Sequence, residues 1–173
     1  MIVTGARRLD GDVQPDRVMA LSAQLVQVHQ GLRERLAGLR QQAATGAPEI
    51  SAGDGPGPGD LLGHCLSFCR AVQAHHTGED TGLFPALQAA APELTPVIVK
   101  LAEDHTLVAG ILQQVRELLA KPAGPDKLRR ELDGLTAILE SHFAFEERRL
   151  AAVLDALGPD TRFPAVFTLP PTG

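Results

Sequence analysis

The chain has 173 residues, enough for one domain with a substantial core, and its hydrophobic content of 44% and charged content of 21% are ordinary for a globular protein. It contains six Phe and neither Tyr nor Trp, so its core must be filled by aliphatic side chains, which favours helices packed on helices. The net charge of −5 offers no electrostatic basis for binding nucleic acid or an anionic membrane surface.

The first predicted helix covers residues 15–45, where apolar positions recur at alternate spacings of four and three residues. Residues 1–14 are predicted to form a flexible extension. Residues 46–60 contain too many Gly and Pro residues for a regular element and are predicted to form a loop. The buried face of this first helix is predicted to comprise Val18, Ser22, Leu25, His29, Leu32, Leu36, Leu39 and Ala43.

The second predicted helix begins after the N-cap residue Asp60 and ends near Phe84, because a residue that precedes proline is pushed out of the helical region. The third begins at Thr95, which is followed by a proline at the first helical position. Its apolar spacing is the most regular of the four. Its buried face is predicted to comprise Ile98, Leu101, His105, Val108, Leu112, Val115 and Leu119.

The fourth predicted helix extends from about Pro125 to Leu157, where a Gly-Pro pair ends it, and residues 158–173 are predicted to form an irregular tail. No strand-like alternation of apolar and polar residues occurs in the sequence. The lengths of the connections suit helices that run alternately up and down. We therefore predict an all-α fold in which residues 15–157 form an antiparallel up-down-up-down four-helix bundle.

No apolar run is long enough to span a bilayer, which takes about 18 to 20 residues, and the N-terminus lacks the apolar core of a signal peptide. The two cysteines, Cys65 and Cys69, lie four residues apart on a predicted helix, so they indicate no disulfide framework. They are most simply small core residues. These features predict a cytoplasmic location.

One histidine lies on the predicted buried face of each helix, and two of the four are followed by Glu four residues later. Side chains four residues apart on a helix have Cβ atoms about 6 Å apart, so each His-Glu pair could bind one metal ion or bridge to a second. A single histidine on an apolar face is more often a core residue than a ligand. However, a buried Glu is costly unless it is paired or bound to metal, and no Lys or Arg lies on these faces near either one. The predicted metal ligands are His29, His75, Glu79, His105, His142 and Glu146.

Two segments carry these His-Glu pairs, AHHTGEDTGLFPAL at residues 74–87 and ESHFAFEERRL at residues 140–150. They resemble the two His-x-x-x-Glu motifs of the hemerythrin-like, HHE cation-binding family. The isolated histidine of the first helix and the EDH sequence at 103–105 complete the order of that family's motifs. The resemblance covers about residues 15–157.

The resemblance implies a hemerythrin-like bundle that holds two iron ions joined by an oxo or hydroxo bridge, although Mn or Zn would suit the same ligand types. It implies that His29 and His75 serve one iron and that His105 and His142 serve the other. Glu79 and Glu146 would be the two bridging carboxylates. One position on each iron would then stay open to a small molecule.

Two departures from the oxygen-carrying hemerythrins bear on function. Those proteins have a histidine four residues after the third-helix histidine, where this chain has Ala109, and they end with His-x-x-x-x-Asp instead of His-x-x-x-Glu. Four His and two Glu are more similar to the bacterial repair-of-iron-centres proteins, whose usual N-terminal cysteine is missing from residues 1–14. Small actinobacterial-type hemerythrin-like proteins are similar as well.

These resemblances imply a protein that binds or turns over O₂, peroxide or nitric oxide, in oxidative or nitrosative stress or in iron handling. A peroxide- or nitric-oxide-processing oxidoreductase is one form of that prediction. An iron- or oxygen-sensing regulatory module, an iron storage or delivery protein, and a bundle without metal are the alternatives. Labile iron would mark a storage protein, whereas no second domain is available to a sensor.

Other polar residues are predicted to play lesser parts. His76 lies about 100° from His75 around the helix axis, so we expect it to be solvated or to support a ligand instead of binding metal. His64 lies about 16 Å from His75 along the axis and is expected to cap one end of the core. Four acidic residues could hydrogen-bond to the imidazoles or lie on a solvated face: Asp80, Glu103, Asp104 and Glu147.

Overall fold

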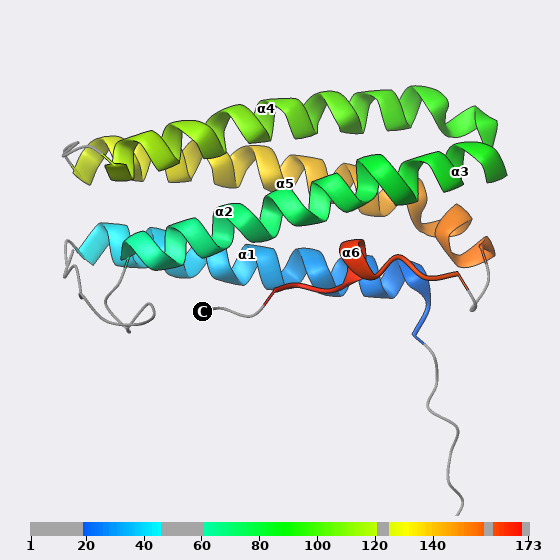
Figure 1. Ribbon diagram of the computed structural model, residues 1–173, viewed down its shortest axis with the longest axis horizontal. Coiled ribbons are helices and arrows are strands. Elements are labelled where there is room, and N and C mark those ends of the chain that lie inside the picture. The colour runs from blue at the N-terminus through cyan, green and yellow to red at the C-terminus, as the bar shows by residue number, and fades with distance from the viewer. Residues whose placement is uncertain (1–18, 46–60, 121–124, 158–160, 171–173) are drawn as a thin grey trace, which may run out of the picture.

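The computed structural model describes residues 19–45, 61–120, 125–157 and 161–170, and these residues are mostly helical with no strand among them (Figure 1). The predicted N-terminal extension and the predicted loop at 46–60 lie outside the described residues. The elements are α1 (Leu21–Thr45), α2 (Leu61–Gly78), the π-helical turn η1 (Glu79–Leu83), α3 (Phe84–Ala90), the 3₁₀ turn η2 (Pro92–Leu94), α4 (Thr95–Ala120), α5 (Pro125–Ala156) and α6 (Pro164–Phe167).

The four longest helices lie side by side, and each runs in the opposite direction to the one before it (Figure 1). Helix α1 packs against α5 and α2, and α4 packs against the same two helices. Their buried faces are filled mainly by Leu, Val and Ile, as the scarcity of aromatic residues predicted. None of the helices within the described residues is long and apolar enough to cross a membrane.

The apolar core is divided into two clusters along the helices. One cluster includes Leu32, Val108 and Phe143, and the other includes Leu25 and Leu101. On α1, α4 and α5 a buried histidine falls between residues of the first cluster and residues of the second. A layer of buried polar side chains therefore separates the two halves of the core.

The second helix does not end near Phe84, contrary to the prediction. The chain stays helical through the π-helical turn η1 and continues as α3 to Ala90. In η1 the backbone N–H of Phe84 donates to the carbonyl of Glu79, five residues back. Pro85 has no N–H, and in a regular α-helix its ring would meet the carbonyl four residues back. The wider turn before Pro85 lets the helix continue past it, and this turn begins at a predicted ligand.

The other predicted boundaries are close to those observed, because α4 begins at Thr95 and α5 spans Pro125–Ala156. Of the predicted irregular tail, residues 161–170 are described, and they are irregular apart from one short helix. These residues return along α1 and α2, with the short helix α6 in the middle (Figure 1). The side chain of Val166 is only 1% exposed and packs with the second core cluster, so burial of apolar side chains accounts for the order of this segment.

Candidate metal centre

Seven buried polar side chains meet in the layer between the two core clusters. They come from α1, α2, η1, α4 and α5, and none is more than 6% exposed. The six predicted ligands are all among them. The complete set is His29, His75, His76, Glu79, His105, His142 and Glu146.

One group of potential ligands lies between α1 and α2. It consists of His29, His75, Glu79 and Glu146, each with one donor atom within 4.8 Å of the others. The Nε2 atoms of His29 and His75 are 3.0 Å apart. Nε2 of His75 lies 3.2 Å from Oε1 of Glu79, and Nε2 of His29 lies 3.5 Å from Oε2 of Glu146. We call these four residues the two-histidine group.

A second group consists of His76, His105 and His142, again with donor atoms within 4.8 Å of one another. The rings of His76 and His105 are stacked, with centroids 3.9 Å apart and planes 6° from parallel. The ring of His142 meets that of His105 edge-on at 4.9 Å. We call these three residues the three-histidine group.

The two carboxylates of the two-histidine group also face histidines of the three-histidine group. Glu79 turns Oε1 to His75 at 3.2 Å and Oε2 to His105 at 3.4 Å, so its two oxygens face imidazoles of different groups. Glu146 places a single oxygen, Oε2, 3.5 Å from His29 and 3.6 Å from His142. Each carboxylate therefore touches one imidazole of each group, as a bridging ligand would.

Of the two roles expected for His76, the solvated one is corrected, because its ring is only 6% exposed and lies with His105 and His142 in the three-histidine group. The reason is that α2 is covered on two sides, by α1 and α6 and by α4. His75 faces α1, and His76 faces His105 on α4. The sequence did carry a signal, since α2 has a broad stripe of adjacent small or apolar pairs before the histidines. The buried pairs are Phe68 and Cys69, Ala71 and Val72, His75 and His76, and Gly78 and Glu79.

Two of the four acidic residues named from the sequence hydrogen-bond to imidazoles. Nδ1 of His29 lies 2.9 Å from Oε1 of Glu147, and Nδ1 of His105 lies 2.8 Å from Oδ1 of Asp80. A carboxylate can only accept, so each of these Nδ1 atoms donates its proton. That leaves the lone pair on Nε2, which points into the centre and is the atom available to a metal.

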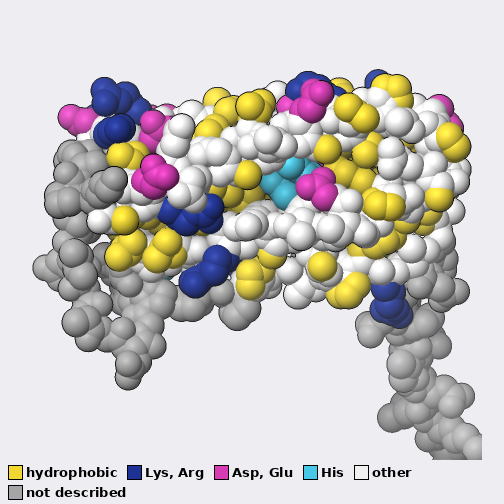
Figure 2. Space-filling model, turned by 45° about the horizontal axis from the view of Figure 1, so that its top comes forward, with side chains coloured by type: hydrophobic (Ala, Val, Ile, Leu, Met, Phe, Trp, Pro, Cys, Tyr) yellow, Lys and Arg dark blue, Asp and Glu magenta, His cyan; other side chains and the backbone are white. Residues whose placement is uncertain are grey.

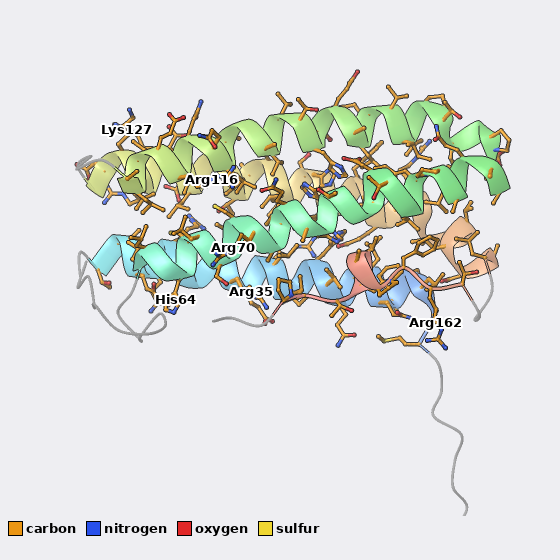
Figure 3. All side chains as sticks on the ribbon, viewed as in Figure 1. Arg35, His64, Arg70, Arg116, Lys127 and Arg162 are labelled. Carbon is orange, nitrogen blue, oxygen red and sulfur yellow. The ribbon has the colours of Figure 1, made fainter. Side chains whose placement is uncertain are left out.

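Of the other residues named from the sequence, only Asp104 lies near a histidine of the centre. Oδ2 of Asp104 lies 3.6 Å from Nδ1 of His142, beyond hydrogen-bond distance but close enough for electrostatic attraction. Glu103 is exposed. His64 lies near the N-terminal end of α2, away from the centre, where its Nδ1 is 3.2 Å from Oε1 of Gln42 (Figure 3). The cysteines are buried in the first core cluster, in line with a packing role.

Burial governs the protonation of these groups. It raises the pKa of Glu146 to about 8, and it raises the pKa of Glu79 well above the usual range, where nearby Glu146 adds to the effect. It lowers the pKa of His142 to about 3 and the pKa of His75 and His76 well below the usual range, and neighbouring histidines add to the shift. Neutral imidazoles are the form that binds metal, and a cation would favour the ionised carboxylates.

The donor atoms have the properties of metal ligands. Among the described residues, both oxygens of Glu79 and of Glu146 and the Nε2 atoms of His76, His105 and His142 have no hydrogen-bond partner. Buried polar atoms nearly always have one. His29 and His75 direct their Nε2 atoms at each other over 3.0 Å. Two imidazole nitrogens about 2.1 Å from one ion and at right angles would be about that far apart. The residues present therefore fit a metal cofactor.

These features are those of a helical metal-binding protein, with imidazoles and carboxylates on facing helices that could hold a metal ion. The model of the hemerythrin HHE cation binding domain matches residues 20–154. The chain belongs to this family, as the resemblance of its motifs indicated. No curated protein and no solved structure matches the chain significantly.

Proposed function

We propose that the protein binds two iron ions in the layer between its core clusters, within a hemerythrin-like antiparallel up-down-up-down four-helix bundle. The two-histidine group would hold one ion and the three-histidine group the other, with Glu79 and Glu146 shared between them. The observation that carries this proposal is the set of buried donor atoms without hydrogen-bond partners among the described residues. Iron held there would supply oxidation-reduction chemistry and positions for small ligands such as O₂, peroxide or nitric oxide.

Inclusion of His76 makes the two positions unequal. Three imidazoles face one ion and two face the other, and the carboxylates are common to both. The position with two imidazoles has one protein ligand fewer, so a small ligand would bind there. This replaces the symmetric arrangement expected from four histidines. Ala109 stands where the oxygen-carrying hemerythrins have a further histidine on the third long helix. In this proposal His76 on α2 supplies that fifth imidazole instead, so Ala109 alone does not distinguish the chain from an oxygen carrier.

A cleft between α2 and α4 opens beside the three-histidine group and offers small molecules a route to the site. Its volume is about 230 Å³, and its walls include His76, His105 and Ala109. Figure 2 shows histidine side chains at the surface of the molecule, beside acidic and hydrophobic side chains. A gas molecule or peroxide would fit such an opening, whereas a large substrate would not reach the buried donor atoms. The cleft therefore favours binding or turnover of small molecules over a purely structural metal.

Iron storage or delivery and iron sensing would each differ from small-molecule binding in an observable property. Storage or delivery of iron calls for labile ions, whereas hydrogen bonds to His29, His75 and His105 from outside the centre hold the imidazoles in place. A sensor would change its fold or its partner with the oxidation state of the iron. A cytoplasmic location and a small gaseous or peroxide ligand stay predictions of the sequence.

Metal content and the visible spectrum of protein purified in air, without added metal, test the proposal. About two iron atoms per chain and a charge-transfer band of bridged iron are expected. Less than one metal per chain after reconstitution with iron would refute it. Loss of added peroxide, and then reduction of nitric oxide, would be measured on the iron-loaded protein to separate a catalyst from a sensor.

A further inference from the structure

The C-terminal segment of residues 161–170 lies against the side of the centre formed by α1 and α2 (Figure 1). Its helix α6 contacts α2, η1 and α1. The family model ends at residue 154, so membership of the family does not account for this segment. We call residues 161–170 the C-terminal strap.

The C-terminal strap reaches a ligand directly. The backbone carbonyl of Val166 lies 3.1 Å from Nδ1 of His75, and both groups are buried. His29 and His105 make the equivalent hydrogen bond to a carboxylate on a neighbouring helix. A carbonyl oxygen can only accept, so this contact places the proton of a neutral His75 on Nδ1. The lone pair of Nε2 is then directed toward the other members of the two-histidine group, His29 and Glu79.

Glycines on α2 and α1 let the strap lie close to both helices. A Cβ atom on Gly78 would lie 3.0 Å from the carbonyl carbon of Ala165 and 3.0 Å from its Cβ. A Cβ atom on Gly31 would lie 2.7 Å from Cδ1 of Leu169. These glycines follow His75 by three residues and His29 by two, so the strap crosses both helices at the level of the centre.

The far end of the strap is held as well. Nη2 of Arg35 on α1 donates to the carbonyl of Pro170 at 2.7 Å. The buried side chain of Val166 joins the core cluster that contains Leu21 and Leu83. The segment is therefore bound at its C-terminal end and in its middle, and the middle is where it meets His75.

We propose that the C-terminal strap is a positioning element of the metal centre. The carbonyl of Val166 holds His75 in the tautomer that presents Nε2 to the ion, and the strap closes the α1–α2 side of the two-histidine group. The inference about metal rests on the proposed function, whereas the tautomer of His75 does not depend on metal.

The substitution Gly78→Leu tests the strap, because its side chain would collide with the backbone of Ala165. Gly110→Leu on α4 is the matched control, since a Cβ there meets nothing within 4 Å. Val166→Asp is the second variant. It leaves the long helices unchanged and places a carboxylate in a buried position, which displaces α6.

The first measurement is the ¹⁵N–¹H correlation spectrum of the imidazoles in metal-free protein at a pH where they are neutral. The wild type and Gly110→Leu are expected to show His75 as the Nδ1–H tautomer, with a slowly exchanging proton. In Gly78→Leu and Val166→Asp that signal should be lost, while the far-ultraviolet circular dichroism stays the same. A folded Val166→Asp protein in which His75 keeps the wild-type signal would overturn the proposal.

The second measurement is iron affinity by competition with a chelator. Loss of the strap should lower the affinity of the two-histidine group for its ion about 10- to 100-fold. This is the range found when the outer hydrogen-bond partner of a metal-binding histidine is removed. The ion at the three-histidine group should be retained. Failure of the wild type to bind iron would refute the proposed function alone, and an unchanged affinity in both displaced variants would refute the role of the strap.

Discussion

Substitution of His76 by alanine is expected to weaken metal binding by the three-histidine group. His76 is buried, its ring stacks on that of His105 at 3.9 Å, and its Nε2 has no hydrogen-bond partner among the described residues. If His76 is a ligand, its loss should cost at least as much affinity as the loss of an outer partner, which is about 10-fold or more. If it only packs against His105, affinity should stay within a small factor of the wild type.

The size of the effect follows from linkage between binding and folding. A ligand that binds only the folded state stabilises it in proportion to the logarithm of its affinity, so a 10-fold loss removes about 1.4 kcal/mol of metal-induced stabilisation. His76→Ala also removes packing, but that cost is present with and without metal. The difference between the two free energies of unfolding therefore isolates the contribution to metal binding.

The assay is denaturant unfolding of the wild type and of His76→Ala, each with and without iron, together with iron content. His105→Ala is the positive control and should lose the same ion. His64→Ala is the negative control, because His64 lies outside the centre and hydrogen-bonds with Gln42. The reasoning fails if His76→Ala keeps the iron content and the metal-induced stabilisation of the wild type, as His64→Ala should.

Three further predictions concern other parts of the site. In metal-free protein, burial raises the pKa of Glu146 from 4.5 to about 8, so the folded state binds more protons than the unfolded state between these values. Unfolded-state histidines have a pKa of about 6.5 and burial lowers the pKa of the histidines of the centre, so the histidines make stability rise with pH until about pH 7.5. Comparison with Glu146→Gln removes this shared histidine contribution. Relative to that variant, the wild type should lose stability as pH rises from 6.5 to 8, by up to about 1.4 kcal/mol per pH unit, and a difference in stability that does not change with pH would contradict the assignment. Arg33 donates to Glu147 at 3.0 Å, and Glu147 in turn lies 2.9 Å from His29. Arg33→Ala should therefore keep the iron content but release iron to a chelator up to about 10-fold faster, and an unchanged release rate would exclude this support. Ala109→Phe should narrow the cleft between α2 and α4 and slow azide binding in stopped-flow absorbance without changing iron content; equal rates would show that ligands enter elsewhere.

Much of the site could be predicted from the sequence because its determinants are local. A His and a Glu four residues apart on a helix share a face whatever the rest of the chain does, and this holds for His75 with Glu79 and for His142 with Glu146. The isolated histidines on α1 and α4 were found because regular apolar spacing shows which face of each helix is buried. The family resemblance then supplied the pairing of histidines between helices.

The burial of His76 was decided by tertiary structure. A single helix shows only that His76 lies to one side of His75. Which side is solvent and which is core depends on α4, whose His105 stacks on His76. The continuation of α2 past Pro85 is similar, because a proline usually ends a helix and the π-helical turn at Glu79 is what lets this helix go on.

The contact between Val166 and His75 could not have been predicted from the sequence at all. The two residues are 91 positions apart, and the atom that accepts the hydrogen bond is a backbone carbonyl, which every residue has. No residue type or spacing marks it in the sequence. The sequence by itself determined the helices, the predicted ligands on their faces and the family. Only the packing of α4 and of the C-terminal strap onto α2 decided the burial of His76 beside His105 and the contact of Val166 with His75, because both depend on which surfaces distant segments cover.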